Sequence, residues 1–182
     1  AAAVDIHRRE SGPDEPRTLE AETSFVLLLL AESQPREAYP LAERLLAVYR
    51  RLYGDDDRRT HEAWNCYAWA MKYVAGPQAA DREYERLVER MRATLPPEDS
   101  DLLSVLGNLA SNRGFVRGFE SAEPILREIY DIRRRTRGKL APDTLIAARK
   151  LARVVLVQLR SDEADALLRE TVELQERTLG AD

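Results

Sequence analysis

The chain has 182 residues, of which 44% are hydrophobic and 33% are charged, and its net charge at pH 7 is −4. This slight acidity disfavours nucleic acid as a partner, because nucleic-acid-binding proteins present basic faces. The sequence has a single cysteine, which excludes an internal disulfide framework and is typical of a reducing compartment. The longest apolar run, residues 25–31, is too short to span a membrane. We therefore expect a cytoplasmic protein with no membrane partner.

The predicted elements follow a period of 42 residues. The grid points of this period are Thr18, Thr60, Leu102 and Thr144. Six residues before these points lie Gly12, Gly54, Pro96 and Gly138. Twenty residues after them lie Ala38, Ala80, Ala122 and Ala164. Because a fixed period of this length indicates stacked supersecondary units, the sequence predicts an array of about four repeats rather than one or two globular domains.

Residues 1–15 are interpreted as the tail of a preceding repeat, because Ile6-His7-Arg8-Arg9 matches Val48-Tyr49-Arg50-Arg51 one period later. Four repeats follow, which we place at residues 16–57, 58–99, 100–141 and 142–182. The chain ends near Gly180, where another repeat would begin, and it shows no polar capping element. We therefore expect a single array, residues 1–182, that is a fragment of a longer array or a larger protein.

Each repeat is predicted to form two antiparallel helices. Pro16 and Pro142 suit a first helical turn, and Asp57 and Asp99 suit N-caps. Helix breaks are expected near residues 33–35, 75–77, 117–118 and 160–162, and a helix end is expected at Gly54. No segment alternates as a strand would. The predicted fold class is all-α, a right-handed α-solenoid of antiparallel helix pairs.

Two features predict the core. The recurring alanines fall early in each second helix, where a small residue lets paired helices approach closely, and a bulkier side chain would overpack by about 1–3 kcal/mol. Trp64 lies on the predicted packing face and is expected in the core, whereas Trp69 suits either the core or the surface.

The marks together resemble tetratricopeptide repeats (TPR) of the 42-residue kinesin-light-chain type, which many bacterial regulatory proteins also carry. The matching segments are Pro142-Asp143-Thr144-Leu145, Asn108-Leu109-Ala110, Gly118-Phe119, Glu37-Ala38, Glu163-Ala164 and Leu179-Gly180. The second repeat departs most, with Asn65-Cys66-Tyr67-Ala68 in place of the triplet. The resemblance covers nearly the whole chain and implies a TPR-like solenoid.

The resemblance also implies a concave groove lined by the first helix of each repeat. The predicted groove residues are Asn65, Trp69, Lys72, Tyr73, Asn108, Ser111, Arg149, Lys150 and Arg153. The resemblance also places in this groove Glu20, Thr23, Ser24, Leu27, Cys66 and Ser104. The set runs from apolar or neutral side chains through amides and aromatics to cations. Asn can pair with an extended peptide backbone, and the cations could hold a carboxylate. The alternative is that residues 149–153 form only a solvated helix face.

No residue pattern indicates catalysis, a metal site or a cofactor. His61 and Cys66 are five residues apart on one predicted helix and do not face each other. No phosphate-binding glycine motif is present. The basic run 133–139 suits the last turn of a helix, although it could also touch phosphate or an acidic partner.

Three functions are compatible with the sequence. The first is a non-catalytic protein–protein interaction module, the repeat region of a larger regulatory protein, which binds a peptide with an acidic segment. Arrays of this kind in bacteria are often attached to signalling NTPases of the NB-ARC type. The second is a structural solenoid segment that associates end to end. The third and most remote is a small-ligand sensor with an apolar site near residues 25–30 and Trp69.

Overall fold

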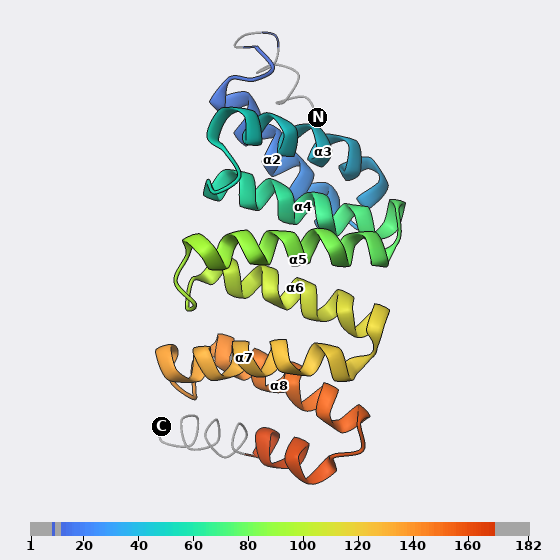
Figure 1. Cartoon of the computed structure of the whole chain (residues 1–182), viewed down its shortest axis with the longest axis vertical. Coiled ribbons are helices and arrows are strands. Elements are labelled where there is room, and N and C mark those ends of the chain that lie inside the picture. The colour runs from blue at the N-terminus through green and yellow to red at the C-terminus, as the bar shows by residue number, and fades with distance from the viewer. Residues whose placement is uncertain (1–8, 10–11, 170–182) are drawn as a thin grey trace. The chain divides into compact units, whose positions relative to one another are not determined.

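A computed structural model describes residue 9 and residues 12–169 of the chain (Figure 1). The described helices are α2 (Pro16–Ala31), α3 (Pro35–Tyr53), α4 (Arg58–Val74), α5 (Pro77–Thr94), α6 (Ser100–Arg117), α7 (Phe119–Arg137) and α8 (Pro142–Val157). A further helix occupies residues 161–169. No strand occurs in this part of the chain, and the all-α prediction is confirmed. Most of the predicted tail, residues 1–15, and the closing Leu179-Gly180 lie outside the described residues.

The described chain divides into two compact units, Ala1–Thr94 and Leu95–Asp182. In the first unit, α3 packs on both α2 and α4, α4 packs on α5, and α2 also touches α4. In the second unit, α7 packs on both α6 and α8. The first helix of each pair begins at residue 16, 58, 100 or 142, at intervals of 42 residues. Each unit is thus a stack of helices that are joined by short turns.

The residues predicted to mark helix starts do lie at the N-termini of helices. Pro16 and Pro142 lie in the first turns of α2 and α8, where a missing N–H costs little. Asp57 caps α4 by accepting a hydrogen bond from the Arg59 backbone N–H, and Asp99 caps α6 by accepting from the backbone N–H groups of Asp101 and Leu102. The Arg59 side chain also binds Asp57 and lowers the pKa of that carboxyl to about 2.

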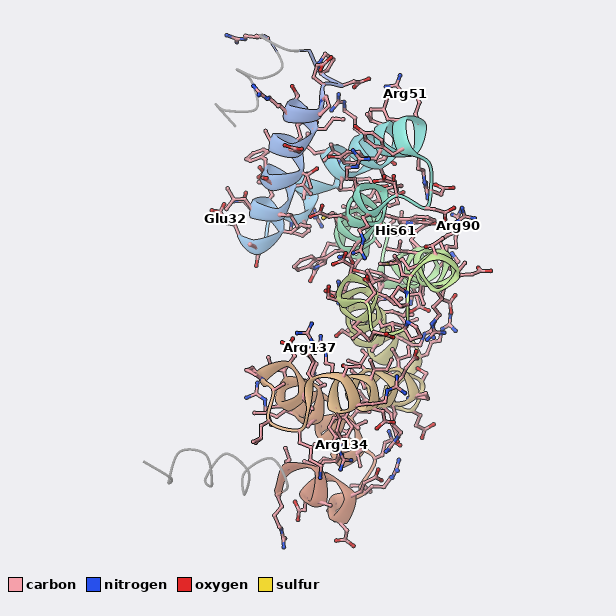
Figure 2. The ribbon with its side chains drawn as sticks, turned by 90° about the vertical axis from the view of Figure 1, so that its left-hand side faces the viewer. Glu32, Arg51, His61, Arg90, Arg134 and Arg137 are labelled. Atoms are coloured by element: carbon pink, nitrogen blue, oxygen red, sulfur yellow. The ribbon has the colours of Figure 1, made fainter. Side chains whose placement is uncertain are left out.

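The first three predicted breaks are confirmed, and the fourth lies earlier than expected. The turn after α8 spans residues 158–160, so Ser161 and Asp162 already belong to the next helix. Leu159 takes a positive φ of 60° without being glycine, so this turn carries no glycine signal in the sequence. The basic run 133–139 does fall at the end of α7, where Figure 2 shows Arg134 and Arg137.

The predicted core residues are buried. All four recurring alanines are at most 1% exposed. Ala122 packs close to Gly114 of α6, where an added Cβ would lie 3.5 Å from the Ala122 Cβ of α7. Trp64 is also buried, its indole N–H donates to the Glu83 carboxylate at 2.9 Å, and the Arg50 guanidinium lies 4.0 Å from its ring centroid. Trp64 therefore anchors the first unit, as the sequence predicted.

Candidate functional site

In the first unit, four predicted groove residues lie on α4. Asn65, Trp69, Lys72 and Tyr73 are spaced so that they share one face of the helix. Trp69 and Tyr73 are 38% and 50% exposed, and the Lys72 ammonium lies 5.6 Å from the Tyr73 ring centroid. We call this set the α4 face. It presents two aromatic rings and a cation to the surface of the first unit.

Two other aligned residues belong to the interior instead. The Thr23 hydroxyl is buried, donates to the Leu19 carbonyl at 2.9 Å and lies 3.0 Å from the Tyr49 hydroxyl. Cys66 is buried as well, and burial raises the pKa of its thiol to about 12, so the thiol is protonated near neutral pH. The prediction that Thr23 and Cys66 line the groove is therefore wrong. A shift of one residue in the repeat alignment turns a side chain by about 100° around the helix, which is enough to move it from the groove to the core.

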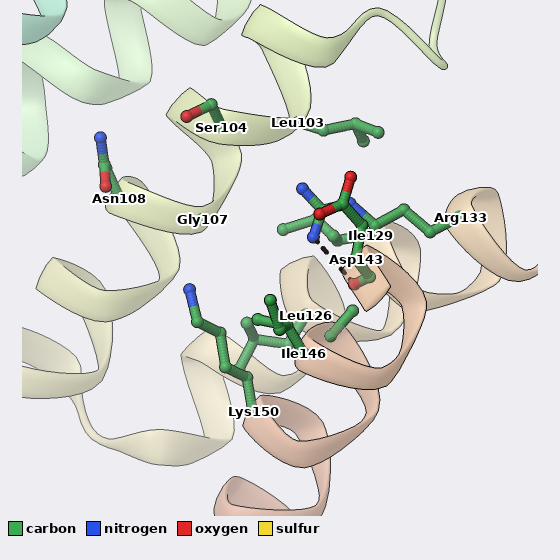
Figure 3. A pocket seen from close by; sticks show the side chains of 11 residues that line it. Leu103, Ser104, Gly107, Asn108, Leu126, Ile129, Arg133, Asp143, Ile146 and Lys150 are labelled. Carbon is green, nitrogen blue, oxygen red and sulfur yellow. Dashed lines mark hydrogen bonds between the residues drawn. The ribbon is translucent and has the colours of Figure 1, made fainter. Parts of the chain in front are cut away.

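In the second unit, α6, α7 and α8 surround an open pocket of about 220 Å³, which we call the polar pocket (Figure 3). Its polar lining residues are Ser104, Asn108, Arg133, Asp143 and Lys150. Figure 3 shows Ser104 and Asn108 on the α6 wall, Lys150 reaching up from α8, and Arg133 beside Asp143. Leu126 and Ile146 supply apolar surface between these walls.

The charges of the polar pocket are partly balanced. The Arg133 guanidinium donates to the backbone carbonyl of Asp143 at 3.1 Å. This bond holds the guanidinium next to the first turn of α8. Lys150 and Arg133 contribute two positive charges to the lining, and Asp143 contributes one negative charge. The pocket therefore has a net charge of about +1 at neutral pH.

A second and smaller hollow of about 80 Å³, the apolar pocket, adjoins the polar pocket. Its apolar lining includes Ala110, Gly114, Phe119, Ala122 and Val154, and its polar rim is formed by Ser111, Lys150 and Arg153. Lys150 and Leu126 line both pockets, so the two hollows share a wall. The pair of pockets brings together four of the predicted groove residues, which are Asn108, Ser111, Lys150 and Arg153.

Arg149 does not line either pocket. It precedes Lys150 by one residue and so points about 100° away around α8. Arg149 and Arg153 are four residues apart and so share one face of α8. Around the helix axis, however, Arg153 lies nearer to Lys150 than Arg149 does. The pockets therefore bring together Lys150 and Arg153, and a joint grip of Arg149 and Arg153 on one carboxylate stays a prediction.

Several arginines of the described residues pair with carboxylates. Arg44 pairs with Glu22 and Asp14, Arg90 pairs with Asp56, and Arg127 pairs with Glu123 and Glu163. Figure 2 places Arg51 and Arg90 on the side of the first unit opposite Glu32. No ion pair within residues 12–169 involves the exposed α8 cations Arg149, Lys150 and Arg153, and the same holds for Arg36 and Arg82 in the first unit. Their charge is available to a ligand.

The sequence did not point to several residues of the two pockets. Leu126, Arg133 and Phe119 come from α7, a second helix, whereas the prediction considered only first helices. The available signal was Gly107 and Gly114 in the interior of α6. Glycines seven residues apart fall on one helical face and leave space there.

Other chemistry has little support in this part of the chain. Within residue 9 and residues 12–169, no group of three potential metal-ligating side chains is close enough to hold an ion. No helix of the same residues is long and apolar enough to cross a membrane. His61 and Cys66 are both buried in α4, five residues apart, so they do not form a nucleophile and base that face each other.

Comparison with known proteins gives structural matches. No protein-family model matches the chain, and no curated protein sequence matches it. A solved structure of a kinesin-light-chain-type protein with nearly identical TPR-like repeats, from Podosopora anserina, matches with a TM-score of 0.78 and 21% identity, over 97% of this chain and 84% of that one. A single-residue variant of that protein gives a TM-score of 0.81 at 21% identity, over 98% of this chain and 84% of that one.

The structure of BtubC (BKLC) from P. vanneervenii also matches, with a TM-score of 0.79 and 18% identity. The alignment covers 97% of this chain and 70% of BtubC. At this level of identity the matches establish the fold. The chain therefore has the TPR-like, all-α solenoid fold of kinesin-light-chain-type repeats, which the sequence predicted.

Proposed function

We propose that the chain is a non-catalytic protein-interaction module, and that its second unit binds an acidic peptide segment across the polar and apolar pockets. The observation that carries this proposal is the position of two exposed α8 cations, Lys150 and Arg153, which lack a carboxylate partner in the described chain and line the two open pockets. Solenoids of stacked helix pairs commonly use such surfaces to bind other proteins.

The walls of both pockets have a role in this proposal. Lys150 and Arg153 bind carboxylates of the segment through charge-assisted hydrogen bonds, which are worth about 1.5–3 kcal/mol each when they are shielded from water. Asn108 and Ser104, on α6, supply groups that can pair with a peptide backbone. The segment is therefore held between α6 and α8, with α7 beneath it.

The α4 face is proposed as a second contact surface for the same class of partner. Trp69 and Tyr73 offer rigid aromatic area, which is enriched at the energetic centres of interfaces. This face is more apolar than the pockets of the second unit, so we assign it to the apolar part of a partner. Attachment of the array to a larger regulatory protein remains a prediction from the sequence.

The test measures binding of fluorescein-labelled twelve-residue peptides by fluorescence anisotropy. Peptides rich in Asp and Glu are compared with the matching Asn and Gln peptides. We expect the acidic set to bind wild type, and we expect Lys150→Glu with Arg153→Glu to weaken that binding by about tenfold or more.

The control variant is Arg36→Glu with Arg82→Glu, which makes the same change in net charge at two exposed positions of the first unit. At about 0.15 M salt, where long-range charge effects are largely screened, it should bind as wild type does. If both double variants lose affinity equally, or if wild type does not prefer acidic peptides, the proposal is wrong. Sedimentation at the same concentrations reports self-association, and a mass that rises with concentration would favour the self-associating solenoid instead.

A further inference from the structure

We infer that the preferred segment is bipartite: one carboxylate side chain enters the polar pocket, and a short aliphatic side chain two residues away enters the apolar pocket. This inference rests on the proposed function, because it names the partner chemistry of the same site. It is carried by the charge of the first pocket, the apolar lining of the second and the wall that they share.

The polar pocket is matched to a single negative charge. Lys150 and Arg133 line it from two different helices, and the Asp143 carboxylate offsets one of these charges. A carboxylate brings the net charge of the pocket close to zero. A phosphate group carries close to two negative charges at neutral pH and would leave an excess negative charge beside Asp143. Aspartate or glutamate is therefore the residue that fits.

The apolar pocket is matched to a small hydrocarbon side chain. Phe119, Ala122 and Val154 line it, and Gly114 leaves space on its α6 side. Its volume is about 80 Å³, little more than a third of the volume of the polar pocket. A valine-sized side chain fits such a space better than an aromatic ring does. Burial of that side chain removes apolar surface from water, which favours binding.

The spacing of the two side chains follows from the shared wall. Lys150 and Leu126 border both pockets, so the two side chains enter neighbouring hollows from the same side of the segment. In an extended chain, side chains two residues apart point to the same side and lie about 7 Å apart. Along α6, Gly107 and Ser111 are small, and this allows the backbone of the segment to approach the helix closely.

The substitution Gly114→Ala tests this inference, because it adds one methyl group to the lining of the apolar pocket. A Cβ at Gly114 would lie 3.4 Å from the Phe119 ring and 3.5 Å from the Ala122 Cβ, which is ordinary van der Waals contact. The φ of Gly114 is not in the left-handed region, so Gly114→Ala fits the helix and occupies part of the apolar pocket. Ala47 is exposed on α3 of the first unit and lines neither pocket. Ala47→Ser, which also adds one heavy atom, is therefore the control.

The experiment uses ten-residue peptides that contain one Glu followed, two positions later, by Val or by Gly. We expect wild type to bind the Val peptide about fivefold more tightly than the Gly peptide. Gly114→Ala should bring this ratio close to one, and Ala47→Ser should leave the ratio unchanged. Moving Val to one or three positions after Glu should also lower the ratio, and replacing Glu by phosphoserine should weaken binding. Thermal melts verify that both variants are folded.

The outcomes separate the two claims. If no acidic peptide binds wild type, the proposed function is wrong and this inference fails with it. If acidic peptides bind but Val and Gly peptides bind equally, or Gly114→Ala leaves the ratio unchanged, the bipartite motif is wrong while the proposed function stands. Tighter binding of the phosphoserine peptide would overturn the match to a single charge.

Discussion

At the scale of single residues, the threonine that recurs with the 42-residue period has a buried hydroxyl without a hydrogen-bond partner in the described residues. Thr18, Thr60 and Thr144 are buried, and no hydrogen-bond partner for their hydroxyl oxygens lies among the described residues. Leu102 fills the equivalent position of the third repeat and is also buried. The position therefore requires a side chain that packs, and the hydroxyl adds a cost of desolvation.

We predict that Thr144→Val stabilises the protein by about 1 kcal/mol, because it removes an unsatisfied buried hydroxyl with almost no change in volume. Urea denaturation measures the change. The matched control is Thr23→Val, which removes a hydroxyl that bonds to Leu19 and Tyr49 and should destabilise the protein. If Thr144→Val lowered the free energy of unfolding as Thr23→Val does, the Thr144 hydroxyl would have to be hydrogen-bonded.

His61 should make stability depend on pH. Burial lowers the pKa of its imidazole, although the backbone of Asp55 and the nearby carboxylates of Asp56 and Asp57 oppose this effect. Because the folded pKa lies below the unfolded value of about 6.5, the folded state favours the neutral ring. This contribution is complete above the unfolded pKa and is lost as the pH falls through it.

We therefore predict that the free energy of unfolding decreases between pH 7 and pH 5, by at most about 1.4 kcal/mol per pH unit from this residue. The measurement is urea denaturation at several pH values, with His7, the other histidine, replaced by Gln in every protein. His61→Leu should flatten the curve over this range. An identical slope with and without His61 would show that other groups cause the pH dependence.

At the scale of helices, most helix ends could be predicted because they are marked by residues that act on the nearby backbone. Pro16, Asp57, Asp99 and Pro142 act through backbone geometry or capping, which depends on few neighbours. The turn near Leu159 was misplaced by about two residues because a leucine in the left-handed region carries no such signal.

The binding surface was harder to predict than the fold. A repeat alignment places residues on a helix face, and it located Asn108, Ser111, Lys150 and Arg153 beside the pockets. It could not show that α7 contributes Arg133 and Phe119, because a pocket depends on which side chains leave space between three helices. Thr23 and Cys66 were misassigned for a related reason, since a shift of one residue turns a side chain from the surface to the core.

Ala122 tests the packing of α7 on α6. It is buried, and it lies opposite Gly114. We predict that Ala122→Leu destabilises the protein by about 1–3 kcal/mol through overpacking, which differential scanning calorimetry can measure. Ala166→Leu, at an exposed position, is the control and should be nearly neutral. An unchanged melting temperature for Ala122→Leu would contradict the helix register that the structure gives.

An ion-pair network holds residues 161–169 against α7. Glu123 accepts hydrogen bonds from Arg127 at 2.6 Å, from Arg160 at 2.8 Å and from Gln158 at 2.9 Å, and Glu163 accepts one from Arg127 at 2.7 Å. These bonds, led by the one from Arg127, lower the pKa of both carboxyl groups. Their contribution is present above the unfolded pKa of about 4.3 and is lost as the pH falls below it.

We predict that Glu123→Gln increases amide hydrogen exchange within residues 161–169 at pH 7 several-fold, because a local opening of this helix becomes easier. Mass spectrometry of peptic fragments measures the exchange. Asp131→Asn, at an exposed position on α7, should leave the exchange of residues 161–169 unchanged. Equal exchange in wild type and Glu123→Gln would show that apolar packing around Ala164 is sufficient to hold the helix.

At the scale of the whole molecule, the overall charge and the charge of the proposed site have opposite signs. The chain carries −4, whereas Lys150 and Arg153 leave the pockets positive. An acidic partner is therefore repelled weakly at long range and attracted only on contact. Such an arrangement limits non-specific binding of acidic proteins and makes recognition depend on fit at short range.

This opposition predicts an unusual dependence of binding on salt. Between about 0.05 M and about 0.5 M salt, screening removes both the long-range repulsion and part of the contact attraction. We expect the association rate of an acidic peptide to change by less than about twofold, while its dissociation rate rises about three- to tenfold. Stopped-flow anisotropy measures both rates. Arg36→Glu with Arg82→Glu, which makes the chain more acidic, should slow association at low salt and leave dissociation unchanged. An association rate that fell steeply with salt in wild type would show that a positive field steers the partner, contrary to the net negative charge of the chain.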